Sequence, residues 1–187
     1  EIGVTMSLVL CLIIGFVWTL PVLAQQIDNP GSAPPAIDVR LYGIADAASR
    51  DRVEADIRTL VDFGTRNTNS DTLSSARGIG AARRWIKSEF DRISDECGGC
   101  LEVSYQRDLV LASESGRITQ DVWVVNVLAI LRGTVYPDRY VIMSGDIDSR
   151  ASDTTDGETD APGANDNASG MAGTIEAARI LSQYDFP

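Results

Sequence analysis

The chain has 187 residues, which is enough for one domain with short extensions but not for two large domains. Its hydrophobic content of 44% argues against an intrinsically disordered protein. Lys and Arg number 16 against 27 Asp and Glu, and the net charge of −11 argues against a nucleic-acid partner. The chain contains no histidine, which excludes Ser-His and Cys-His catalytic pairs and His-ligated metal sites within it.

The first 24 residues are predicted to be a secretory signal. The run Leu8–Leu20 is almost entirely apolar, and small residues at Val22 and Ala24 precede the expected cleavage after Ala24. A membrane anchor is the alternative, but it needs about 20 apolar residues and fewer are present. We therefore expect a secreted or periplasmic protein that begins at Gln25 and has no stable membrane anchor after cleavage.

Alternating helices and strands are predicted beyond the signal. Residues 25–45 contain several prolines and are expected to be a flexible lead-in. Apolar side chains recur at helical spacing in residues 46–63, 75–93 and 170–184, and the β-like runs are 101–111, 122–131 and 139–144. The run 139–144 is nearly continuous in apolar residues, which predicts a central strand buried on both faces. This order indicates an α/β layered domain.

Two cysteines, Cys97 and Cys100, remain once the signal and its Cys11 are removed. Two cysteines alone cannot complete a tetrahedral zinc site. In an exported protein a short-loop disulfide is the favoured interpretation. The alternative is a thioredoxin-like redox motif, but such a motif usually opens a helix, whereas this one follows a predicted helix. We therefore predict a structural Cys97–Cys100 disulfide.

An acidic segment follows the apolar run 139–144. Eight acidic residues and one basic residue, Arg150, lie between Asp146 and Glu176. Open α/β sheets bind ligands at the carboxyl ends of their strands, and crowded carboxylates repel one another unless a cation neutralises them. The segment is therefore a candidate metal loop, with a solvated surface turn as the alternative. An EF-hand is excluded because Arg150 and Ala151 stand where Asp or Asn and Gly are needed.

A second candidate segment, residues 161–170, directly precedes the last predicted helix. Asp166 stands where this loop enters the helix, and Gly170 permits close packing there. The stretch Asn167-Ala168-Ser169 also matches a glycosylation sequon. Because three residues are a weak signal, glycosylation is the less favoured interpretation of this segment.

Four segments, in this order, resemble the secreted co-catalytic zinc aminopeptidases, which are relatives of glutamate carboxypeptidase and glutaminyl cyclase. They are Gly64-Thr65-Arg66-Asn67-Thr68, Asn126-Val127-Leu128-Ala129, Ser144-Gly145-Asp146-Ile147-Asp148-Ser149-Arg150 and Pro162-Gly163-Ala164-Asn165-Asp166-Asn167-Ala168-Ser169-Gly170. The last segment is the most specific. The resemblance implies a three-layer α/β/α mixed-sheet zinc exopeptidase fold, of which residues 46–187 are the N-terminal portion, incomplete at the C-terminus. It also implies that N-terminal bonds of peptide substrates are hydrolysed.

The same resemblance implies roles for three acidic residues. The family has a His-x-Asp motif in which the His binds zinc and the Asp orients that His; here Asp146 takes the first position and Asp148 the second. The carboxylate that bridges two zinc ions falls on Asp166, and the Asp166–Asn167 peptide bond is expected to be cis. The implied cofactor is a pair of zinc ions that activate a shared water. Because Asp146 offers oxygen in place of nitrogen, Mn²⁺ or another divalent cation is the alternative.

Other residues of the family site have no counterpart here. The resemblance places a Glu-Glu pair, a later acidic ligand and a final His beyond Pro187, so we expect the chain as given to be inactive. The alternative function is that of a non-catalytic secreted relative that binds peptide or a cation. The sequence does not indicate substrate-binding residues or an oligomeric state.

Overall fold

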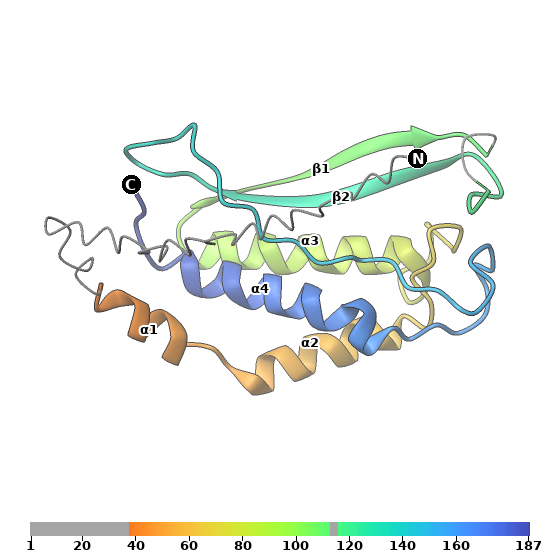
Figure 1. Cartoon of the computed structure of the whole chain (residues 1–187), viewed down its shortest axis with the longest axis horizontal. Coiled ribbons are helices and arrows are strands. Elements are labelled where there is room, and N and C mark those ends of the chain that lie inside the picture. The colour runs from red at the N-terminus through yellow and green to blue at the C-terminus, as the bar shows by residue number, and fades with distance from the viewer. Residues whose placement is uncertain (1–37, 113–115) are drawn as a thin grey trace, which may run out of the picture. The chain divides into compact units, whose positions relative to one another are not determined.

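The computed structural model describes residues 38–112 and 116–187 (Figure 1). The predicted signal lies outside these residues, as does the lead-in up to Ile37. Among the described residues, no helix is long and apolar enough to cross a membrane. In chain order the elements are the helices α1 (Arg40–Asp46), α2 (Arg50–Asp62) and α3 (Gly78–Glu96), the strands β1 (Leu101–Val110) and β2 (Val122–Leu131), the turn η1 (Ala164–Ala168) and the helix α4 (Ser169–Leu181).

The three predicted helices are confirmed as α2, α3 and α4, with ends within four residues of the prediction. Helix α2 begins after Ser49, whose hydroxyl accepts a hydrogen bond from the Arg52 N–H at 3.3 Å and so caps the first turn. Helix α3 begins at Gly78, which has φ of 85°. A Cβ at Gly78 would lie 2.4 Å from the Asp71 carbonyl oxygen, so only glycine fits there.

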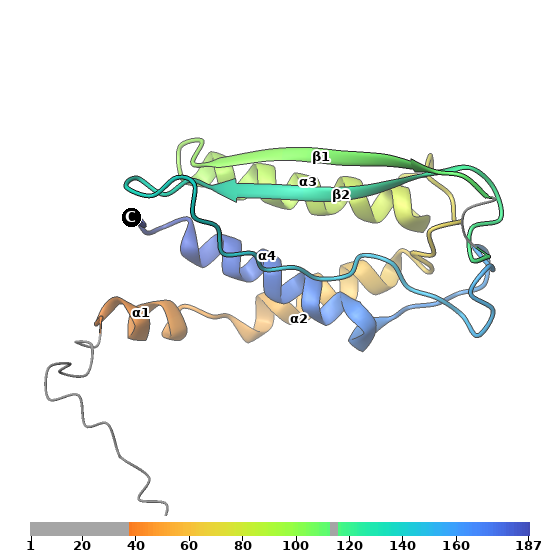
Figure 2. The same cartoon turned by 45° about the horizontal axis from the view of Figure 1, so that its top comes forward.

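The two predicted strands 101–111 and 122–131 are confirmed as an antiparallel hairpin. Its register runs from the pair Leu101 and Leu131 to the pair Val110 and Val122. In both views the helices lie on one side of this hairpin, with α3 next to it and α4 beyond (Figures 1 and 2). The described residues therefore form a mixed α/β fold.

The hydrophobic core lies where α2, α3, α4 and the hairpin meet. Leu60 of α2, Ile86 and Phe90 of α3, and Ile175 of α4 are each no more than 3% exposed, and they pack together with Leu101 of β1. Each such side chain contributes about 1.5–3 kcal/mol on burial. This cluster holds α4, and the loop that leads into it, against the rest of the fold.

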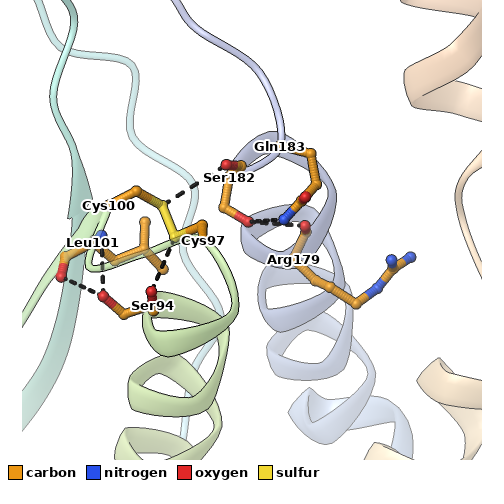
Figure 3. The surroundings of a disulfide bond; sticks show 7 residues. All are labelled: Ser94, Cys97, Cys100, Leu101, Arg179, Ser182 and Gln183. Carbon is orange, nitrogen blue, oxygen red and sulfur yellow. Dashed lines mark hydrogen bonds between the residues drawn. A yellow bond between two sulfur atoms is a disulfide. The ribbon is translucent and has the colours of Figure 1, made fainter.

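A disulfide joins Cys97 and Cys100, the two cysteines for which the sequence predicts one (Figure 3). It closes the turn between the end of α3 and the start of β1. The Ser94 hydroxyl donates a hydrogen bond to the Leu101 carbonyl at 2.9 Å and accepts one from the Leu101 N–H at 3.2 Å. The Cys100 sulfur lies 3.8 Å from the Ser182 carbonyl oxygen, so the turn also contacts the end of α4.

The prediction of a buried central strand at residues 139–144 is wrong for this structure. The segment is extended but pairs with no strand of the described residues, and Val141 and Ile142 are 97% and 85% exposed. An apolar run predicts burial, but a strand also needs a neighbour that accepts and donates its backbone hydrogen bonds. The described sheet has two strands, so the three-layer mixed sheet stays a prediction.

Helices α2 and α4 are joined by a buried carboxylate, Glu176, which is 4% exposed. It accepts hydrogen bonds from the Ser49 N–H at 2.8 Å and from Arg179 at 2.8 and 2.6 Å, and Arg52 lies 3.5 Å away. Burial alone would raise the pKa of Glu176, but the bonds from Arg179 and Ser49 outweigh it and leave the pKa below its usual value.

We expect Glu176→Gln to destabilise the fold by about 1–3 kcal/mol near pH 7, because Arg179 and Ser49 lose a charged acceptor. The lowered pKa makes this stabilisation fully present above about pH 4.3 and lost as pH falls through the folded-state pKa. The difference between the two proteins in urea-unfolding free energy should therefore shrink on acidification. Glu54→Gln, at an exposed Glu54–Arg58 pair, is the control and should cost at most about 0.5 kcal/mol.

The exposed run at residues 140–143 should drive self-association, because exposed contiguous apolar strands pair with other chains. We expect the chain to elute with a mass that rises with concentration, and Ile142→Lys to reduce this effect. Leu73→Lys is the matched control, since Leu73 is 90% exposed but stands alone. Size-exclusion chromatography with light scattering decides: a wild-type chain that is monomeric at every concentration contradicts the prediction.

Candidate functional site

The two acidic segments of the predicted site are held together by one buried arginine, Arg66, in the loop after α2. Its side chain is among the largest fully buried ones, at 1% exposure. The guanidinium donates to carbonyl oxygens of three separate parts of the chain: Leu60 at 2.8 Å, Ile147 at 2.9 Å, Pro162 at 2.8 Å and Gly163 at 3.1 Å. Arg66 therefore fixes the segment that carries Asp146 and Asp148 next to the segment that leads to Asp166.

Ser149 makes a second connection between the same segments. Its hydroxyl accepts the Arg66 N–H at 2.9 Å and donates to the Ala161 carbonyl at 2.6 Å, and its N–H donates to the Arg66 carbonyl at 3.3 Å. Ser149 is 3% exposed, so these bonds are shielded from water. The residues directly before and after Asp148, Ile147 and Ser149, are thus both held by hydrogen bonds to Arg66.

Glycines allow the closest approach of the two segments. A Cβ at Gly145 would lie 2.6 Å from the Met171 backbone nitrogen, so residue 145 crosses directly over the start of α4. Gly163 has φ of 48°, and a Cβ there would lie 2.5 Å from the Asp166 carbonyl oxygen. Only glycine fits either position. Asp146 follows Gly145 and therefore lies beside the beginning of α4, which in turn directly follows the turn that contains Asp166.

The three predicted site residues occupy different environments. Asp146 and Asp166 are exposed, and Asp148 is half-buried. Asp166 lies within η1, where it and Asn167 have non-helical backbone angles, and the peptide bond between them is cis. None of the ion pairs among residues 38–112 and 116–187 includes Asp146 or Asp166. Both carboxylates therefore face solvent without a cationic partner.

The described residues do not by themselves fit a zinc centre. Zinc normally takes three protein ligands even in an open catalytic site. In the described part of the chain, no group of three His, Cys, Asp or Glu side chains is close enough to hold a metal ion. Asp146 and Asp166 are thus the two residues of the described chain that stand at metal-ligand positions of the resembled family, and both would bind through oxygen.

Arg66 is the functional residue for which the sequence predicted no role. Burial lowers its pKa below that of an ordinary arginine, and the nearby Asp148 carboxylate opposes this shift. Asp148 therefore lies near the buried cation, although no ion pair among the described residues joins the two. The available signal was the position of Arg66 in the segment Gly64–Thr68, a charged residue between the apolar end of a helix and a polar loop.

The sequon at Asn167 is partly buried. The Asn167 side-chain oxygen is buried without a hydrogen-bond partner among the described residues, and it lies 1.9 Å from where a Cβ of residue 170 would be. This oxygen packs against Gly170 at the start of α4. Glycosylation would use the side-chain nitrogen, so it stays the less favoured prediction.

A groove of about 650 Å³ lies beside the acidic residues. Its wall includes Asp146 and Asp148, and it continues along α3 and β2 to Arg83 and Val125. Two carboxylates in the wall of a groove can bind a cation or a protonated amine. The lining therefore allows a ligand to contact Asp146 and Asp148 and also the hairpin residues of the same groove.

Residues 126–186 match the sequence model of peptidase family M28, a range that contains Asp146, Asp148 and Asp166. The chain is 40% identical over 89% of its length to a protein of Pyrenophora teres f. teres named "Probable zinc metalloprotease". A relative of the same name in Leptosphaeria maculans is 41% identical over 82% of the chain, and one in Pyricularia oryzae is 44% identical over 70%.

The chain covers 35%, 35% and 26% of these three relatives, so it spans about a third of their length. No solved structure is significantly similar to it. The family match and the relatives agree with the resemblance read from the four sequence segments. The chain belongs to peptidase family M28, and it carries part of that family's domain.

Proposed function

We propose that this chain supplies part of the active site of a zinc-dependent exopeptidase that removes residues from the N-terminus of peptides. Asp146 and Asp166 would be its metal ligands and Asp148 its orienting residue. The whole domain would have the three-layer α/β/α fold. Peptide is the substrate in this proposal, and nucleic acid is not a partner.

The observation that carries the proposal is the junction at Arg66. Four carbonyl oxygens from three parts of the chain converge on one guanidinium, and two of those parts lead to Asp146 and to Asp166. A loop that served only as surface would not need a buried cation to hold it against a second loop. The match to family M28 covers the same two segments.

The predicted sites argue for weak metal binding by this chain. Asp146 gives an oxygen where the resemblance expects a nitrogen, and oxygen ligands favour harder cations such as Mn²⁺ or Mg²⁺. No third donor is close to the pair in the described residues. We therefore propose that the chain alone does not turn over peptides.

A non-catalytic relative that binds a cation or a peptide is the second candidate function. The exposed, unpaired carboxylates of Asp146 and Asp166 favour it, because they are open to a ligand without a complete zinc centre. A peptide assay separates the two functions. Turnover of an aminoacyl-nitroanilide by a protein that contains this chain and binds zinc supports the exopeptidase.

Export and localisation belong to the same proposal. We propose that residues 1–24 are removed on secretion or transport to the periplasm and that Cys97 and Cys100 meet an oxidising environment there. The disulfide agrees with such a compartment. The intact mass of the exported protein would test it, since cleavage after Ala24 leaves Gln25 as the first residue.

We expect the chain to bind Zn²⁺ or Mn²⁺ weakly and to show no hydrolysis of an aminoacyl-nitroanilide. Asp146→His should raise Zn²⁺ affinity about tenfold or more, because imidazole nitrogen suits zinc better and Asp148 stands two residues away. Isothermal titration calorimetry measures both proteins.

Asp153→Asn is the matched control for this experiment. Asp153 lies in the same acidic loop, and its side chain only accepts bonds from Thr155, which asparagine can keep. Its metal affinity should equal that of the wild type. Asp166→Asn, which removes a proposed ligand, should weaken metal binding. If Asp153→Asn weakens binding as much as Asp166→Asn, the metal is attracted by the net charge of the loop, and the assignment of the ligands is contradicted.

Replacing the guanidinium tests the junction itself. We expect Arg66→Lys to lower the free energy of unfolding by about 2–4 kcal/mol, because an ammonium cannot reach four carbonyls arranged for a planar fork. Metal affinity should fall with it. Arg58→Lys, at an exposed helical pair, is the control and should change stability by less than about 0.5 kcal/mol. Chemical unfolding that leaves Arg66→Lys as stable as Arg58→Lys would contradict this role.

A further inference from the structure

A second groove lies on the hairpin side of α3, outside the acidic pair. Its volume is about 800 Å³, and we call it the arginine groove because Arg83, Arg84 and Arg107 line it. Tyr105 of β1 and Trp123 of β2 form its aromatic part, and residues 68–73 form its rim. Three basic side chains in one groove are unusual for a chain of net charge −11.

Arg83 is buried yet incompletely paired. It is 9% exposed, and its Nη1 donates to the Trp123 carbonyl at 3.2 Å, but its Nε is buried without a hydrogen-bond partner. Burial lowers the pKa of Arg83; the Tyr105 side chain opposes this effect, and Arg107 adds to it. A buried guanidinium donor left unpaired carries a desolvation cost that an anionic acceptor would remove.

The arginines of the groove are not neutralised by ion pairs. None of the ion pairs among the described residues includes Arg83, Arg84 or Arg107. Arg107 lies over the Tyr105 ring, with its guanidinium carbon 5.2 Å from the ring centre. Arg84 donates to backbone carbonyls of the rim. Positive charge is therefore fixed in the groove without carboxylates bound to it.

Acidic residues also line the groove, namely Asp71, Asp121 and Glu158. Two of them are already engaged: Asp71 accepts the N–H groups of Leu73 and Ser74, and Asp121 accepts the Ala112 N–H. A groove with mixed charge and two aromatic rings suits a peptide, whose backbone is polar and whose side chains are varied. The unpaired donor of Arg83 favours a peptide that carries a carboxylate.

The arginine groove adjoins the groove at the acidic site. Arg83 and Val125 line both grooves, together with Thr68 and Asn69. A peptide bound near Asp146 and Asp148 can therefore extend towards Arg83 and place a carboxylate at the arginine groove.

We propose that the arginine groove binds a carboxylate of a peptide, with Arg83 as its anchor and Arg107 as the second cation. The carboxylate is either an acidic side chain or the C-terminus of a short peptide. The choice of a peptide as ligand rests on the proposed function, but binding in the groove requires neither a metal ion nor hydrolysis.

Three peptides with a blocked N-terminus separate the two sources of the carboxylate. Acetyl-Ala-Glu-Ala-amide carries an acidic side chain, acetyl-Ala-Ala-Ala carries a free C-terminal carboxylate, and acetyl-Ala-Gln-Ala-amide carries neither. Calorimetry with the metal-free chain should give affinities for one or both carboxylate peptides that are about tenfold higher than for the glutamine peptide. Whichever carboxylate peptide binds more tightly identifies the source. Inorganic phosphate is a fourth probe, and tighter binding of phosphate than of either peptide overturns the assignment to peptide.

Variants locate the binding. Arg107→Gln should weaken the carboxylate peptides about fivefold or more, while Arg58→Gln, an exposed arginine on α2 that makes the same change of charge, should not. Arg83→Gln should weaken binding further, and Arg107→Gln keeps the test decisive because its exposed side chain is not needed for folding. Equal binding of the glutamate and glutamine peptides, or equal effects of Arg107→Gln and Arg58→Gln, overturns the proposal. Carboxylate binding by this chain does not depend on turnover, so absence of turnover in a longer, zinc-loaded protein that contains the chain would count against the exopeptidase alone.

Discussion

The position of every acidic residue in the candidate site depends on one buried guanidinium. A charged group removed from water must be compensated, and Arg66 is compensated by four carbonyl oxygens and by the Asp148 carboxylate nearby. Those carbonyls belong to α2, to the segment after residue 144 and to the turn before η1. Because the planar guanidinium donates its hydrogen bonds in fixed directions, each of these segments is held in one position.

The consequence is a site that is positioned but incomplete in the described residues. Asp146 and Asp166 lie on adjoining segments, exposed and without cationic partners, and no third donor stands with them. The connection behind them, by contrast, is buried and is hydrogen-bonded through Arg66 and Ser149.

Buried charge is treated in two ways in this fold. Glu176 meets Ser49 and Arg179 and joins two helices, which makes it a structural pair. Arg83 has one backbone acceptor and an unpaired Nε. The first arrangement is complete without a ligand, whereas the second leaves one buried donor unpaired among the described residues. The proposed carboxylate site rests on this difference.

Periodicity in the sequence predicted α2, α3, α4 and the hairpin, because these elements are determined by local spacing of apolar residues. The segments around Asp146 and Asp166 were also identified from sequence, through a family resemblance that the comparisons support. Two features were decided by tertiary contacts alone. Residues 139–144 were predicted to be a buried strand, but a strand requires a pairing partner, which periodicity does not encode. Arg66 was missed because its acceptors lie at residues 60, 147, 162 and 163. A hydrogen bond between positions so far apart in the chain exists only once the chain has folded.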